Sequence, residues 1–210
     1  MVSGQQQAEF LPLRGLANVL AGLLAIVVAA IAARLAVQLL SLGTAHWRRS
    51  LIDSRLDKAA DVTILGLSIL FVVWCRRARI NAERHAYRQR RARAWAFWGW
   101  IVPIVDLWFP FQIMGDIWRA GLPPEQRRKT AWLPALWWTC WLLSGMSFGA
   151  RAMPAGSGPV PHITTATHVS ALVLLAIAGA TLIAIIRKVT NGPVGSPLTW
   201  PSRVDDDVVL

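Results

Sequence analysis

Long apolar stretches separated by short charged segments dominate this chain. Four stretches, at about 16–42, 59–75, 131–150 and 166–186, approach or exceed the roughly 20 residues that a helix needs to cross the hydrocarbon core. Their apolar residues form continuous runs and do not alternate with polar ones. The pattern predicts an all-α integral membrane protein with four transmembrane helices in a single membrane domain, residues 16–186. The first stretch is longer than the 7–15 apolar residues of a signal peptide, so we expect a retained helix.

A fifth apolar stretch, residues 95–119, is interrupted by polar residues and prolines. These are Pro103, Asp106, Pro110 and Asp116. A proline inside a helix removes an amide donor and crowds the preceding turn, so one straight helix is not expected here. Asp106 is predicted to be the N-cap of a half-helix that runs from about residue 107 to residue 119. The sequence therefore predicts a Pro-broken re-entrant or interfacial helical element.

The basic residues decide how this element sits. The net charge is +11, and most of the 22 Lys and Arg residues lie between the apolar stretches. If residues 95–119 cross the membrane, the two sides carry nearly equal basic charge. If they enter and return, sixteen basic residues lie on one side and five on the other. The positive-inside rule favours the second arrangement. We therefore expect a multi-pass plasma-membrane protein with both termini, 1–15 and a flexible tail at 187–210, in the cytoplasm.

A basic loop at 76–94 and the tryptophans that follow it form a candidate surface for anionic lipid headgroups or a protein partner. Its residues are Arg76, Arg77, Arg79, Arg84, Arg88, Arg90, Arg91, Arg93, Trp95, Trp98 and Trp100. Clusters of four to eight basic residues beside a spanning helix attract anionic lipids, although the same charges also fix topology. Basic charge placed beside apolar spans does not indicate nucleic acid. Alanines at every fourth position from Ala17 to Ala33 favour close helix packing, within one bundle or in a homo-oligomer.

The order of these residues resembles a known family. Arg76-Arg77-Ala78-Arg79-Ile80-Asn81-Ala82 precedes Trp95, and Trp100, Pro103, Asp106-Leu107-Trp108, Pro110, Gln112 and Asp116-Ile117-Trp118-Arg119 follow. The pattern is similar to that of the domain of unknown function 4328 (DUF4328) family, small multi-helix membrane proteins of actinobacteria. The resemblance covers roughly residues 59–186. It implies a membrane location and a helical fold, and it implies no activity.

Candidate chemistry is sparse. Six residues are structural or ion-site candidates: Pro103, Asp106, Trp108, Pro110, Asp116 and Arg119. An ionisable residue in a membrane segment suggests function, although Asp116 can equally pair with Arg119 or with an arginine of the basic loop. The four histidines lie in separate segments, so we expect no metal site, no cofactor and no enzyme. The first hypothesis is a non-catalytic scaffold or accessory protein. The alternative is a small proton- or cation-coupled transporter or channel that uses Asp106.

Overall fold

Five α-helices make up the fold in the part of the chain that the structure describes. It is a computed structural model whose described residues are 10–40, 49–83, 107–127, 131–152 and 161–197. The helices are α1 (Arg14–Leu40), α2 (Arg49–Glu83), α4 (Phe109–Ala120), α5 (Trp132–Ala152) and α6 (Pro161–Asn191). Two short 3-10 turns, η2 (Pro124–Gln126) and η3 (Pro193–Gly195), complete it. These described residues contain no strand, which confirms the all-helical class for them.

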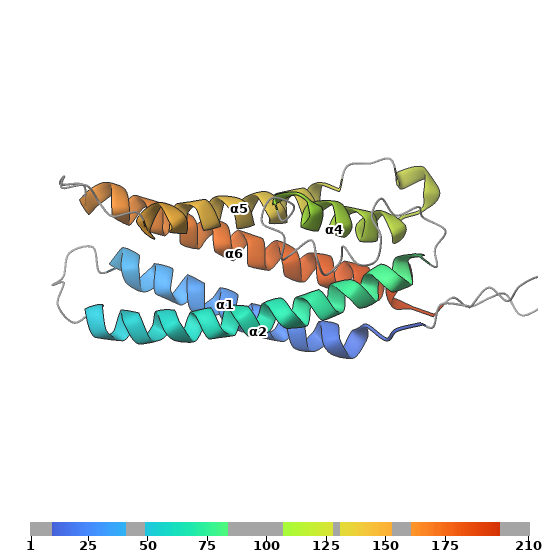
Figure 1. The fold of residues 1–210 in the computed structure, drawn as a ribbon, viewed down its shortest axis with the longest axis horizontal. Coiled ribbons are helices and arrows are strands. Elements are labelled where there is room, and N and C mark those ends of the chain that lie inside the picture. Colours follow the sequence, from blue (N-terminus) through green and yellow to red (C-terminus); the bar gives the residue numbers. More distant parts are fainter. Residues whose placement is uncertain (1–9, 41–48, 84–106, 128–130, 153–160, 198–210) are drawn as a thin grey trace, which may run out of the picture.

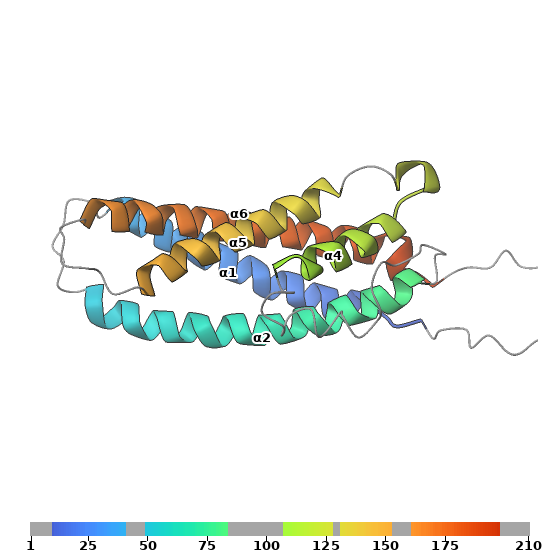
Figure 2. The same cartoon turned by 45° about the horizontal axis from the view of Figure 1, so that its top comes forward.

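The four long helices lie side by side in an elongated bundle, and consecutive ones run in opposite directions (Figure 1). α6 packs along α5 and α1, whereas α2 packs against α1, α4 and η3. The starts of α1 and α5 and the ends of α2 and α6 therefore lie at one end of the bundle (Figures 1 and 2). This end, which holds Arg14, Glu83, Trp132 and Asn191, is called the basic end below.

Small and branched residues bring α1 and α6 together. Leu13, Ala17 and Leu20 are buried at spacings of three and four residues, which places them on one helix face. A Cβ atom at Gly179 would lie 2.5 Å from Cγ2 of Val28, so only glycine allows this approach of the two backbones. Farther along the alanine series, Ala25, Ala29 and Ala33 are exposed. The predicted stripe is therefore used for packing only where α1 meets the core.

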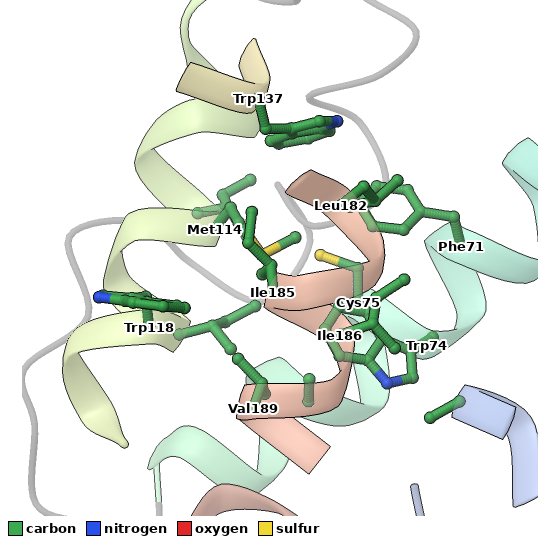
Figure 3. Close-up of a cluster of buried hydrophobic side chains, with 14 of the residues drawn as sticks. Phe71, Trp74, Cys75, Met114, Trp118, Trp137, Leu182, Ile185, Ile186 and Val189 are labelled. Carbon is green, nitrogen blue, oxygen red and sulfur yellow. The ribbon is translucent and has the colours of Figure 1, made fainter. Parts of the chain in front are cut away.

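α4 occupies half of the bundle and does not run its full length. Its 12 residues give a length of about 18 Å, too short to cross a hydrocarbon core of about 30 Å. It starts near the middle of the bundle and runs toward the basic end, in contact with α2, α5 and α6 (Figure 2). Figure 3 shows Met114 and Trp118 of α4 beside Ile185 and Val189 of α6. The main hydrophobic core is thus in this half.

Two helices continue past the ends of the predicted spans. The second span was expected at about 59–75, followed by a basic loop at 76–94, and α2 continues as a helix to Glu83, where Ala78 and Ala82 are buried. The flexible tail was expected from 187, but α6 continues to Asn191, and Val189 and Val194 are buried. Gly195 makes the turn after α6 possible, since a Cβ atom there would overlap the carbonyl of Thr190.

Two of the described helices are long and apolar enough to cross a membrane, judged by length and composition alone. They are α1 over Arg14–Val37 and α6 over Thr167–Asn191. The other two predicted spans therefore remain predictions.

Candidate functional site

Basic residues of α1, α2, α4 and α6 and of the turn after η2 lie at the basic end of the bundle, where these helix ends come together (Figure 1). The described ones are Arg14, Arg76, Arg77, Arg79, Arg119, Arg127, Arg187 and Lys188. The described acidic residues of this end are Glu83, Asp116 and Glu125. The excess of positive charge is produced by the fold, because it brings together helix ends that are more than 100 residues apart in sequence.

The three described arginines of the predicted basic loop have different environments. Arg76 is exposed on α2. Nη1 of Arg77 donates a hydrogen bond to the carbonyl of Pro12 at 3.4 Å, near the upper limit for such a bond. Arg79 is 2% exposed, and its Nη1 lies 3.3 Å from Oε1 of Glu83, one helical turn later. A buried, paired arginine is part of the packing, so the predicted surface cannot include Arg79 as a free cation.

The other members of that surface lie outside the described residues. They are Arg84, Arg88, Arg90, Arg91, Arg93, Trp95, Trp98 and Trp100. Pro103 and Asp106 also fall in the stretch that the structure does not describe, so the transport hypothesis built on Asp106 remains a prediction.

Asn81 of α2 joins both ends of the chain to the bundle. Its Oδ1 accepts a hydrogen bond from the N–H of Leu11 at 3.0 Å, and its Nδ2 donates to the carbonyl of Leu11 at 2.8 Å. Nδ2 also donates to the carbonyl of Val194 at 3.1 Å. The side chain is 1% exposed, so water does not compete for these bonds. Sequence reasoning assigned Asn81 no role. In the sequence, the one sign of such a role is that Asn81 is an uncharged amide in a basic stretch, between Ala78 and Ala82.

A second polar contact lies deeper in the same region. Nε1 of Trp74 donates to Oγ1 of Thr190 at 3.3 Å, and both residues are buried. This bond links α2 to the last turn of α6. Together with Asn81, it fixes the end of α6 and η3 against α2.

The start of α4 differs from the prediction in one respect. The N-cap position falls on Trp108, not on Asp106, and no side chain caps the helix. Pro110 stands in the first two positions of the helix, where its missing N–H has no intrahelical partner to lose, so it fixes the start. Nε1 of Trp138 donates to the carbonyl of Leu107 at 2.7 Å and holds this start against α5.

Asp116 lies on α4 and forms an ion pair with Arg119, three residues later in the same helix. Its side chain is 2% exposed, and Oδ1 lies 3.6 Å from Nη1 of Arg119. Gly115 leaves room for this arrangement, because a Cβ atom there would lie 3.2 Å from the same Nη1 atom. The pairing with Arg119 is one of the two that the sequence suggests, and it gives Asp116 a structural role.

Tryptophans near α4 serve both the core and the outer surface. Trp118, Trp137 and Trp138 are buried, and the rings of Trp137 and Trp138 have centroids 5.3 Å apart. Trp108 and Trp132 are exposed by 46% and 63%. Of these tryptophans, Trp118, Trp137 and Trp138 therefore fill space inside the bundle, whereas Trp108 and Trp132 lie on its outer surface.

One exposed cation lies over a buried ring. Nζ of Lys188, on α6, is 4.4 Å from the centroid of Trp118, within the range of a cation–π interaction. Sequence reasoning did not pair these residues, because 70 positions separate them and nothing local indicates that α4 and α6 end together.

Within the described residues, no three His, Cys, Asp or Glu side chains come together in a way that could hold a metal ion. No curated protein and no solved structure matches the chain significantly. One family model does match, and it covers residues 41–191, most of the chain. The chain therefore belongs to the family described as a domain of unknown function, DUF4328.

Proposed function

We propose that this protein is a four-span, non-catalytic membrane protein, a scaffold or accessory protein whose basic end binds the anionic lipid headgroups of the cytoplasmic leaflet. The observation that carries the proposal is the convergence of basic side chains from α1, α2, α4 and α6 at one end of an apolar bundle.

Each of the four long helices exposes large apolar side chains in its described part. Large exposed side chains include Val19 and Ile26 on α1, Leu65 and Ile69 on α2, Leu136 and Met146 on α5, and Val173 and Ile177 on α6. Only 17% of the most apolar stretch of α1 is buried inside the protein. Soluble monomers rarely expose contiguous apolar patches of this extent, whereas lipid tails solvate them without cost.

The placement of α4 supports a re-entrant element. α2 ends at the basic end, and α4 starts near the middle of the bundle and returns to the same end (Figures 1 and 2). We infer that α4 belongs to a re-entrant element, as the sequence predicts for residues 95–119. This arrangement keeps the number of crossings at four and both termini on one side.

Orientation follows from the charges. Cytoplasmic loops of membrane proteins carry the excess of Lys and Arg, and the cytoplasmic leaflet carries anionic lipid. Each basic residue near such a surface contributes about 1 kcal/mol of attraction. The basic end would therefore face the cytoplasm.

The test is the stability of the purified protein in lipid nanodiscs. Discs of phosphatidylcholine are compared with discs in which part of the lipid is phosphatidylglycerol. A ligand that binds only the folded state raises the unfolding temperature, so the anionic discs should give the higher midpoint. The difference should shrink as salt is raised, because exposed charges are screened. Equal midpoints in both kinds of disc at low salt would refute the lipid-binding function.

A further inference from the structure

We propose that the seam between the ends of α4 and α6, centred on Lys188 above the ring of Trp118, is a discrete site for the phosphate of one anionic phospholipid. The inference rests on the proposed function and sharpens it, because it names one place on the basic end in preference to a diffuse attraction.

The basic residues of this end differ in how their charges are held. Arg79 is buried beside Glu83, and Arg119 lies beside Asp116. Nε of Arg127 donates to the carbonyl of Leu122 at 3.1 Å. Lys188 is an exposed residue whose ammonium lies over an aromatic ring, and its contact with Trp118 leaves N–H donors pointing away from the ring.

The ring beneath Lys188 is rigidly placed. Trp118 is 7% exposed, and it lies against Ile185 and Val189 of α6 (Figure 3). A lysine chain that is held in this way loses less conformational freedom when it binds a phosphate than one that moves freely in water. The contact therefore makes Lys188 better prepared for an anion than an exposed basic residue on open helix surface.

The depth of the seam fits a phosphate. Trp132, at the start of α5, is 63% exposed, more than any other described tryptophan, and we place it at headgroup level, where tryptophans are enriched. The preceding residue, Ala131, lies at the level of Gly115 on α4, because its Cβ atom is 3.9 Å from where a Cβ atom of Gly115 would lie. Trp118 follows Gly115 by three residues, about 4.5 Å farther toward the basic end. Lys188 thus lies one helical turn outside the tryptophan level.

Further positive charge surrounds the seam. Arg187 precedes Lys188 on α6 and is exposed, and Arg119 follows Trp118 on α4. Basic sites between membrane helices on the cytoplasmic side bind the headgroups of acidic lipids. The ligand class is therefore a phospholipid with net negative charge, such as phosphatidylglycerol or cardiolipin.

The experiment measures phosphatidylglycerol binding to the detergent-solubilised protein by native mass spectrometry. The main variant is Lys188→Met, which keeps an apolar stem over Trp118 and removes the charge. Lys188→Arg keeps the charge. Arg14→Gln and Arg76→Gln remove exposed charges elsewhere on the same end. We expect Lys188→Met to lower the affinity about tenfold, the size of one charge-assisted hydrogen bond, and Lys188→Arg to retain most of it.

Four outcomes are informative. A loss in Lys188→Met well above the losses in Arg14→Gln and Arg76→Gln supports the site. Equal losses in all three overturn it and leave the proposed function standing. Wild-type protein that binds phosphatidylcholine as well as phosphatidylglycerol refutes the proposed function itself. Inorganic phosphate that displaces the lipid at equal concentration would show that the ligand is the free ion, and it would overturn the lipid assignment.

Discussion

Asn81 is the residue whose side chain connects three separate parts of the chain. Its amide bonds to the backbone at Leu11, 70 residues away, and at Val194, 113 residues away. The charged residues around it lie nearer the surface or pair within their own helix. The order of this end of the bundle therefore depends more on one buried amide than on its many arginines.

The first prediction concerns this amide. Asn81→Leu keeps the volume of the side chain but leaves the N–H and carbonyl of Leu11 and the carbonyl of Val194 without their partner. Unsatisfied buried polar groups cost about 1–3 kcal/mol each, so the unfolding temperature should fall clearly. Thermal unfolding in detergent measures this fall in unfolding temperature. The control is Arg76→Ala, a substitution at an exposed position of the same helix. If both variants unfold at the wild-type temperature, the bonds of Asn81 contribute no stability.

At the scale of elements, the close approach of α1 and α6 depends on Gly179. A methyl group there would meet Val28, whose β-branched side chain has one preferred rotamer in a helix and cannot swing away. This contact lies toward the half of the bundle that α4 does not fill, and few of the described core residues lie beyond it.

The second prediction tests this approach. Gly179→Ala should destabilise the protein by about 1–3 kcal/mol, the usual cost of overpacking. Val28→Ala should restore much of that loss when the two changes are combined, although it destabilises the protein alone. Gly66→Ala on α2, where a Cβ atom meets nothing within 4 Å, is the matched control. Strictly additive effects of the two substitutions would contradict a direct contact.

Elements with strong local signals were predictable, and those that depend on distant partners were not. The half-helix expected at about 107–119 is observed as Phe109–Ala120, because Pro110 marks its start in the sequence itself. The predicted span at about 59–75 did not include the part of α2 from Arg76 to Glu83. The arginines and alanines of residues 76–83 form no apolar stripe in the sequence. This part of α2 is buried by η3 and by the segment before α1, which are distant in sequence. The contact between Lys188 and Trp118 could not be predicted for the same reason.

At the scale of the whole molecule, two features combine. Large apolar side chains are exposed along the described parts of the long helices, and an excess of basic residues lies where α1 and α5 start and α2 and α6 end. In the proposed four-span arrangement, the positive-inside rule would place the basic end on the cytoplasmic side. The short α4 leaves that orientation intact because it begins and ends on the same side of the bundle's middle.

The most direct test of the four-span account is the side of the membrane on which the segment after α4 lies. Pro123→Cys places a thiol at an exposed position between α4 and α5, and Leu40→Cys places one at the end of α1, where the side chain is 86% exposed. Both native cysteines are buried, so the wild-type chain serves as the background control.

Intact cells are treated with a membrane-impermeant maleimide before and after the membrane is opened. The account predicts that Leu40→Cys is labelled from outside and that Pro123→Cys is labelled only after the membrane is opened. If residues 95–119 cross the membrane, Pro123→Cys will be labelled in intact cells together with Leu40→Cys. That result would contradict the re-entrant arrangement and the cytoplasmic basic end.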